Sequence, residues 1–306
     1  MVSPASKRRA VRMSVESGLG TVAQACRAMT FNRSTFYRTS QERQESKELR
    51  GAIIDLSEEQ PRYGYRRVTA VMRREGQVVN PKRVQRVRRA EGLQVRKKQR
   101  KTRRTGSGTA RRRRAERRNE VWSWDFVHDM TEQGSRFRVL TLIDEHTRQC
   151  LAIRAGWSLR AGDVIATLEE AISIHGRPEN IRSDNGPEFI AYHVQDWLES
   201  HSIGTMYIKP GSPWEQAYIE SFHDKLRDEC MNRELFSSLT EASTILEEWR
   251  QEYNEHRPHS SLGYRTPGEY ARLCNPHLRS GIALTPMGIA NHRRNHQPKT
   301  PAELQF

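Results

Sequence analysis

The spacing of apolar residues is helical in the first third of the chain and changes after Glu120 to a pattern of strands and helices. Downstream of that point, three short apolar runs separated by turn-forming residues predict an antiparallel meander over 121–130, 137–144 and 149–156. The pattern then predicts a helix over 161–175, a strand over 178–183, a helix over 188–200 and a strand over 203–208. This order predicts an α/β domain with a mixed five-stranded sheet and flanking helices.

The first 45 residues have the pattern of a compact helical unit. We expect a helix over 6–17 that ends at Gly18, a second from Thr21, and a third segment over 33–38. Two short helices and a tight turn resemble a helix-turn-helix, so residues 1–45 are predicted to bind DNA, with Arg33 and Arg38 as candidate contacts. A small helical bundle with a basic surface is the alternative for this unit.

A second helical module is expected over residues 50–95. One helix runs from Tyr65 to Glu75, and a second begins at Asn80-Pro81, which supply an N-cap and a Pro at the first helical position, and stops near Gly92. The candidates for DNA contact on these two helices are Arg66, Arg67, Lys82, Arg83 and Arg86. Arg88 and Arg89 are likewise expected to be available to phosphate. These all-α modules would precede the α/β domain.

Charge is distributed very unevenly along the 306 residues. Residues 1–120 hold 33 Lys and Arg against 11 Asp and Glu, a net charge of +22, whereas residues 121–306 hold 19 against 26, a net charge of −7. A polycation of this size suits a polyanion, because each neutralised phosphate releases condensed counterions. Anionic lipid is the competing partner, but the chain has no long apolar run and no lipidation signal. We therefore expect a soluble intracellular protein that acts on nucleic acid, with no membrane partner.

The most basic stretch is the segment 96–119, which has almost no apolar residues. It contains a run of four arginines, Arg111, Arg112, Arg113 and Arg114. Such a segment buries too little apolar surface to fold alone, so we expect a flexible arm that follows the DNA backbone. A nuclear-localisation signal is an alternative interpretation of the same run. We assign 120–272 to the α/β core and 273–306 to a partly disordered tail.

Asp125 is the first candidate catalytic residue. Alternation along the strand 121–130 places Asp125 on one face and Trp122, Trp124 and Phe126 on the other. A carboxylate among strand residues this apolar costs several kcal/mol unless it is paired or bound to a metal. A solvated strand face is the alternative interpretation of this Asp.

Of two further candidate carboxylates, one follows a strand and the other lies on a helix. Asp184 follows the strand 178–183 and precedes Asn185-Gly186, a turn signal at the rim of the sheet. Glu220 lies on a helix that begins at Ser212-Pro213-Trp214-Glu215, a capping box with Pro at the first helical position. Taken singly, the first carboxylate is explained as well by turn chemistry and the second by a solvated helix face. Together, three carboxylates suit two Mg²⁺ ions, which prefer oxygen ligands and catalyse displacement at phosphorus.

The sequence motifs around these carboxylates are a much more specific signal than the spacing of Asp184 and Glu220, which are separated by 35 residues. They read WSWDFV at 122–127, SDNGPEF at 183–189 and AYIESF at 217–222, followed by YN at 253–254, HRPH at 256–259, LG at 262–263 and TP at 266–267. Together they resemble the second-frame proteins (OrfB type) of the insertion-sequence-3 family of bacterial transposases. The similarity covers about residues 50–270.

This resemblance implies an RNase H-like catalytic core of the kind found in retroviral integrases. It implies that Asp125, Asp184 and Glu220 are the catalytic residues and hold two Mg²⁺ ions, with Mn²⁺ as a substitute. The family's basic residue, seven positions after the Glu, falls on Arg227, which would contact DNA or steady the site, and Lys225 is a nearby alternative. The segment 256–259 would form a structural or DNA-facing turn.

The resemblance also implies a reaction and partners. Water, or a terminal 3′-OH, would attack a phosphodiester at the ends of an insertion sequence, through a circular intermediate and without a covalent protein–DNA bond. The substrates would be terminal inverted repeats and target DNA, and pairing two ends would require a dimer or a larger assembly. An upstream OrfA protein, joined by frameshifting, is a further expected partner.

Two other functions are alternatives to a transposase. A DNA-binding regulator with an inactive core would have no need to hold three like charges close together. A structure-specific nuclease on the same fold would need neither the basic arm nor the helical modules. A transposase uses all of these features, and it is the function we expect.

Overall fold

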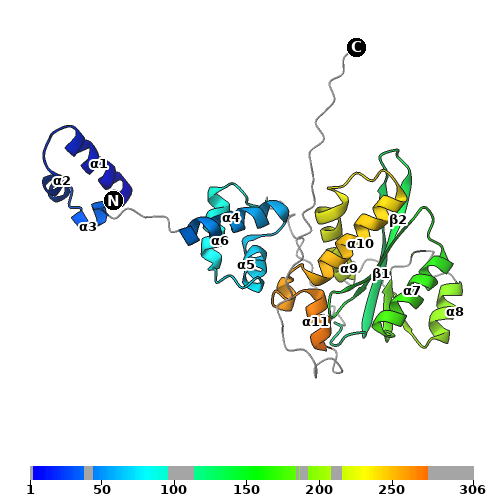
Figure 1. The fold of residues 1–306 in the computed structure, drawn as a ribbon. Helices are drawn as coiled ribbons and strands as arrows, with labels where there is room; N and C mark the ends of the chain where they lie inside the picture. The colour runs from blue at the N-terminus through cyan, green and yellow to red at the C-terminus, as the bar shows by residue number, and fades with distance from the viewer. Residues whose placement is uncertain are drawn as a thin grey trace, which may run out of the picture. The chain divides into compact units, whose positions relative to one another are not determined.

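The computed structural model describes residues 3–37, 44–95, 114–183, 186, 192–207 and 216–274. The chain divides into two compact units, one made of Met1–Thr69 and Val79–Arg96 and the other of Ala70–Val78 and Lys97–Phe306. Helices make up the first unit, whereas the second contains the sheet (Figure 1).

The N-terminal end of the first unit has three short helices, α1 (Pro4–Glu16), α2 (Val22–Ala28) and α3 (Arg33–Tyr37), as predicted. Thr21 and Gln24 form a capping box that starts α2: the Gln24 backbone N–H donates to Thr21 Oγ1, and Thr21 N–H donates to Gln24 Oε1 at 2.8 Å. A small core of Val11, Ala25 and Cys26 holds the helices together.

Three more helices follow, α4 (Gln44–Glu59), α5 (Tyr65–Arg74) and α6 (Pro81–Ala90). The predicted start of α6 is confirmed, because the Asn80 side chain accepts from the Lys82 N–H at 2.9 Å. α4 crosses the expected boundary between the two helical modules and was not predicted. Its first turns are polar, so its apolar stripe emerges only around Ile53, which is fully buried.

The sheet of the second unit has the strand order β3-β2-β1-β4-β5. β1 (Val121–Met130), β2 (Arg136–Asp144) and β3 (Cys150–Gly156) are antiparallel, while β4 (Asn180–Ser183) and β5 (Gly204–Tyr207) run parallel to β1. The predicted mixed five-stranded sheet is therefore confirmed. The parallel connections pass through helices α7 (Ala161–His175) and α8 (Tyr192–Ser200). β1 lies in the centre and is paired on both edges.

Alternation along β1 separates two apolar cores, one on each face of the sheet. Trp122 and Trp124 pack with buried residues of α7 and α8. Val127 packs on the opposite face, with α9 (Ala217–Leu226) and α10 (Leu239–Glu255). Figure 1 shows these two pairs of helices on either side of the strands. The predicted separation of the aromatic residues from Asp125 is confirmed, and Asp125 lies on the side of α9.

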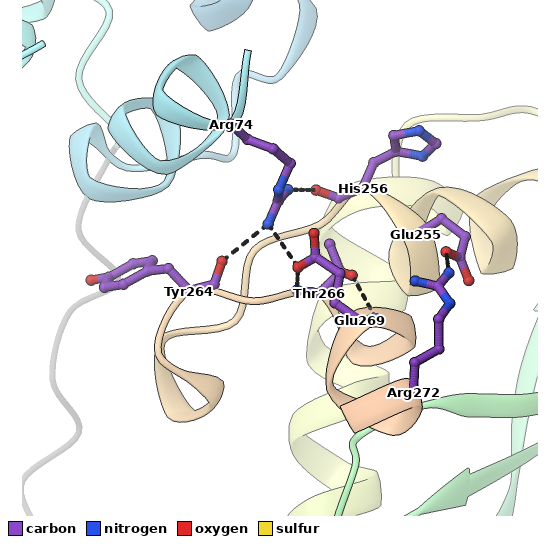
Figure 2. A network of polar contacts seen from close by, with 7 residues as sticks. All are labelled: Arg74, Glu255, His256, Tyr264, Thr266, Glu269 and Arg272. Atoms are coloured by element: carbon purple, nitrogen blue, oxygen red, sulfur yellow. Dashed lines mark hydrogen bonds and ion pairs between the residues drawn. The ribbon is translucent and has the colours of Figure 1, made fainter. Parts of the chain in front are cut away.

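The end of the second unit is a turn and a short helix, α11 (Pro267–Cys274), joined by polar contacts to residues of the segment 70–78 (Figure 2). Thr266 and Glu269 form a reciprocal capping box: Thr266 N–H donates to Glu269 Oε2 at 2.8 Å, and Glu269 N–H donates to Thr266 Oγ1 at 3.1 Å. Arg74 donates to the backbone carbonyls of His256 and Tyr264, each at 3.2 Å, and pairs with Glu269 at 3.1 Å. This turn is therefore held by main-chain as well as side-chain contacts.

His175, the last residue of α7, makes stability depend on pH. Burial lowers its pKa to about 4, and the positive charge of Arg118 lowers it further. The unfolded chain therefore binds a proton near the ordinary His pKa of about 6.5, whereas the folded chain binds it only near pH 4. Stability from this group is complete above about pH 6.5 and is lost as the pH falls toward 4.

We expect His175→Gln, which removes this proton, to flatten the fall of thermal stability between pH 6.5 and 4. The slope of the unfolding free energy against pH should decrease by at most about 1.4 kcal/mol per pH unit, the value for one proton. Unfolding midpoints of both proteins across this range measure it. His201→Gln, which changes an exposed histidine, is the control and should leave the slope unchanged. Parallel pH profiles for wild type and His175→Gln would contradict this expectation.

Candidate active site

Asp125 lies in the middle of β1 with its side chain 20% exposed. One carboxylate oxygen, Oδ1, accepts from the Phe126 backbone N–H at 2.7 Å. Thr141 of β2 stands directly opposite in the ladder and donates its hydroxyl to the Asp125 backbone carbonyl at 3.0 Å. The predicted carboxylate is thus held on a paired strand and reaches solvent.

Glu220 is exposed in the first turn of α9, while Ile219, Phe222 and Leu226 on other positions of the same helix are buried against the sheet. α9 packs on β1, so Asp125 and Glu220 come from neighbouring elements. The capping box predicted at 212–215 lies outside the described residues. α9 is described from Ala217, with Gln216 as its N-cap.

The third predicted carboxylate, Asp184, lies outside the described residues, as do Asn185 and the segment 187–191. Its strand is described up to Ser183. In the parallel ladder between β1 and β4, Ser123 pairs with Arg182. In the sequence, Asp125 follows Ser123 by two positions and Asp184 follows Arg182 by two positions.

His223, one turn after Glu220, contacts Asp125 from α9. Its Nε2 is 2.8 Å from Thr141 Oγ1, and its Nδ1 is 3.6 Å from Asp125 Oδ2. Burial lowers the pKa of His223 to about 4, and the charge of Arg227 adds to this effect. This residue was not predicted from the sequence. The signal that could have found it was its spacing, since positions three apart on a helix share a face.

A buried ion pair lies on the same sheet face next to Asp125. Arg182 Nε is 2.9 Å from Glu145 Oε1, and Ser123 donates its hydroxyl to the same oxygen. Burial raises the pKa of Glu145, and the Arg182 charge and the Ser123 hydrogen bond act against that rise. A buried charge is tolerated only with partners of this kind. Glu145 and Arg182 are therefore structural components beneath the predicted site.

The basic residues near Glu220 differ in their surroundings. α9 passes at Arg227 into a π-helix, Arg227–Met231, and Arg227 is exposed. The Lys225 ammonium donates to Ser221 Oγ at 2.7 Å, on its own helix. Of the two candidates for DNA contact, Arg227 is the more exposed.

The HRPH motif at 256–259 forms part of a buried polar network. Arg257 is buried and donates two parallel bonds of 2.6 Å to Glu229 in the π-helix, while its Nη1 is 3.2 Å from His259 Nε2. Because arginine has no acceptor, His259 Nε2 accepts this bond. The network ties the turn after α10 to the segment that follows Glu220. The structural alternative holds for Arg257 and His259, whereas His256 is exposed.

Most of the predicted DNA contacts on the helical modules are exposed. Arg33, Arg66, Lys82, Arg83, Arg86 and Arg114 are exposed and Arg67 is half-buried, while Arg38 and Arg111–Arg113 lie outside the described residues. The prediction that Arg88 is available to phosphate was wrong. Its side chain is buried, and it donates to the Leu93 carbonyl at 2.6 and 3.1 Å, closing the end of α6. The apolar spacing of α6 did not separate Arg88 from its exposed neighbours.

The donor chemistry of the site suits a hard divalent cation. Asp125 and Glu220 offer carboxylate oxygens that solvent reaches, which is the ligand type that Mg²⁺ prefers. Within the described ranges no three His, Cys, Asp or Glu side chains are grouped closely enough to hold a metal ion. Asp184, the remaining predicted ligand, falls in a gap between these ranges.

Family models match most of the described chain. Two integrase core domain models match residues 115–213 and 201–267, and an HTH-like domain model matches residues 44–101. The 31.7 kDa protein of insertion element IS407 from Burkholderia multivorans is 37% identical over 81% of this chain and 89% of its own length. The chain belongs to the insertion-sequence-3 family of transposases. It has the RNase H-like fold and is a DDE-type transposase, an enzyme of DNA transposition by polynucleotidyl transfer.

The chain is also similar to other proteins. The 39.2 kDa protein of insertion element IS476 from Xanthomonas euvesicatoria is 34% identical over 88% of this transposase and 78% of its own length. Transposase InsD for insertion element IS2 from Escherichia coli is 28% identical over 71% of this chain and 76% of its own length. The HTLV-2 integrase catalytic core domain in complex with magnesium is 17% identical, with a TM-score of 0.41, and covers 52% of this chain and 99% of that one.

None of the helices within the described ranges has the length and apolar character needed to cross a bilayer.

We expect Arg257→Ala to destabilise this transposase by about 3–5 kcal/mol, because the substitution leaves the largely buried Glu229 without its partner. Urea unfolding of the full chain measures the change. Arg265→Ala removes an exposed arginine of the same turn and should change stability by less than about 0.5 kcal/mol. Equal midpoints for the two variants would rule out a structural role for Arg257.

Proposed function

We propose that Asp125, Asp184 and Glu220 form the catalytic site and hold two Mg²⁺ ions, with Mn²⁺ as a substitute. The observation that supports this most directly is the position of Asp125: its partly exposed carboxylate lies on the α9 side of a central strand, and α9 is the helix that carries Glu220. When bound, the ions would activate the attacking oxygen and stabilise the leaving oxygen of a phosphodiester.

The protein's own residues would orient the reaction. Asp125 is fixed by the β1–β2 ladder and by its hydrogen bond from Phe126, so its carboxylate needs little ordering when DNA binds. Glu220 projects from a helix whose Ile219, Phe222 and Leu226 are buried, and it presents its carboxylate to solvent. Arg227, exposed at the end of this helix, would bind a DNA phosphate next to the site.

The reaction we propose is cleavage and strand transfer at the ends of a bacterial insertion sequence. In cleavage, water attacks the phosphorus and releases a 3′-OH. In strand transfer, that 3′-OH attacks a second phosphodiester, so that one P–O bond forms as another breaks. Joining one end of the element to the other would give a circular intermediate before integration.

DNA recognition is assigned to the basic helical modules and the arm. Lys82, Arg83 and Arg86 are exposed on α6, while Val84 of the same helix is buried, so the helix presents a basic surface. Arg33 and Arg38 of the first unit, Arg66 and Arg67 of α5, and Arg111–Arg114 of the arm would add phosphate contacts. We propose the domain boundaries expected from the sequence, 1–45, 50–95, 96–119, 120–272 and 273–306.

Assembly follows from the reaction. Two element ends must be held together, which requires at least a dimer of this transposase, and target DNA must enter the same complex. An upstream OrfA protein, as a frameshift fusion, would supply further DNA binding. We place the complex in the bacterial cytoplasm, with the nucleoid.

We expect Glu220→Gln to abolish Mg²⁺-dependent cleavage and strand joining, because the amide keeps the shape of the side chain but loses its negative charge. Binding to the same DNA should be largely unchanged. The substrate is a linear duplex that carries the inverted repeats flanking the gene, with products resolved on a denaturing gel and binding measured by gel shift. Glu199→Gln, an exposed glutamate of α8 on the other side of the sheet, is the control and should be fully active. Activity retained in Glu220→Gln would refute the assignment of the triad.

A second experiment tests the arm. Replacing Arg111–Arg114 with Ala should reduce the slope of log affinity against log salt by about 0.9 for each DNA phosphate that the arm no longer neutralises. Replacing the same four residues with Lys keeps the charge and should keep the slope. Affinities measured between about 50 and 200 mM salt decide the point, and an unchanged slope in the Ala variant would show that the arm does not bind phosphate.

A further inference from the structure

Three side chains from three elements meet at the buried edge of the proposed site. Asp125 comes from β1, Thr141 from β2 and His223 from α9. Thr141 is fully buried and His223 is 13% exposed. Thr141 and Asp125 are direct partners in the antiparallel ladder, so the distance between these two is set by backbone pairing.

The hydrogen bonds in this group have one consistent direction. The Thr141 hydroxyl donates its single hydrogen to the Asp125 backbone carbonyl at 3.0 Å. Its oxygen is then left to accept from His223 Nε2 at 2.8 Å. The hydrogen of the neutral ring is then on Nε2, so Nδ1, which lies 3.6 Å from Asp125 Oδ2, makes no hydrogen bond to the carboxylate and limits its movement only by contact.

This arrangement connects both carboxylates of the site. The ring of His223 reaches from α9 to Thr141 of β2 and Asp125 of β1, and Glu220 lies one turn earlier on the same helix. The ring therefore links the helix that carries Glu220 to the strand that carries Asp125. Ligand groups of a metal site must be held within about 0.5 Å of the productive geometry by such supporting contacts.

We propose that His223, anchored by Thr141, is a positioning residue that holds the Asp125 carboxylate and fixes its separation from Glu220 for divalent-cation binding. The inference rests on the proposed function, in which these carboxylates are metal ligands. It assigns His223 no contact with DNA and no proton transfer. Removal of either anchor leaves the carboxylates in place but without the support that orders them.

The test is Mn²⁺ binding to the full chain, measured by calorimetry without DNA. His223→Phe keeps a planar ring and removes both nitrogens, and Thr141→Val keeps the shape of the side chain and removes the hydroxyl. Each should weaken Mn²⁺ binding about 10–100-fold, the usual effect of losing a group that orients a metal ligand. His223→Gln retains a donor for Thr141 and should recover part of the affinity.

Matched controls separate this role from a loss of folding. His128→Phe changes an exposed histidine on the same strand as Asp125, and Thr167→Val removes a buried hydroxyl on α7, on the other face of the sheet. Both should bind Mn²⁺ as the wild type does. Near-UV circular dichroism and the urea midpoint of every variant report whether the core is intact.

The outcomes distinguish the inference from the proposed function. If His223→Phe and Thr141→Val lose stability but keep wild-type Mn²⁺ affinity, while Asp125→Asn loses it, the pair is merely structural and the inference is overturned. If Asp125→Asn also binds normally, the proposed metal site itself is wrong. Weakened binding in both anchor variants with an intact core, together with partial recovery in His223→Gln, supports the positioning role.

Discussion

The alternation of side chains along the central strand β1 is the constraint on which the rest of this structure depends. β1 is paired on both edges and covered on both faces, so each residue must suit one of two different cores. Trp122 and Trp124 fill the core under α7 and α8, and the same parity sends Asp125 to the face covered by α9. A shift of one residue in the register of β1 would turn Asp125 into the core under α7 and α8. The same shift would turn the indoles of Trp122 and Trp124 toward the proposed site.

Two buried ion pairs lie near Asp125 and the helix that carries Glu220. Arg182 pairs with Glu145, and Arg257 pairs with Glu229. Burying such groups costs several kcal/mol per ion, and the cost is offset only when geometry and hydrogen bonds are good. The two pairs fix side chains next to β1, β4 and the π-helix after α9. Rigid support of this kind is what a site for phosphoryl transfer requires.

The strands, most of the helices and their order were predictable because each has a strong local signal. Alternating and helical apolar spacing located β1 and α7, and the Asn80-Pro81 cap located α6. α4 was missed because its first turns are polar. Arg88 was misassigned because exposure of a basic residue depends on what the end of its helix packs against, and here the Leu93 carbonyl takes up its donors.

The sequence alone determined the class of fold and the family and pointed to Asp125 and Glu220 as candidates, because these follow from short motifs and from periodicity along the chain. Tertiary structure decided which polar side chains meet. It brought His223 to Thr141, 82 positions away, and Arg257 to Glu229, 28 positions away, and it separated Arg227 from the buried arginines. Such pairings depend on strand register and helix docking, which bring together residues distant in sequence, and no local pattern encodes them.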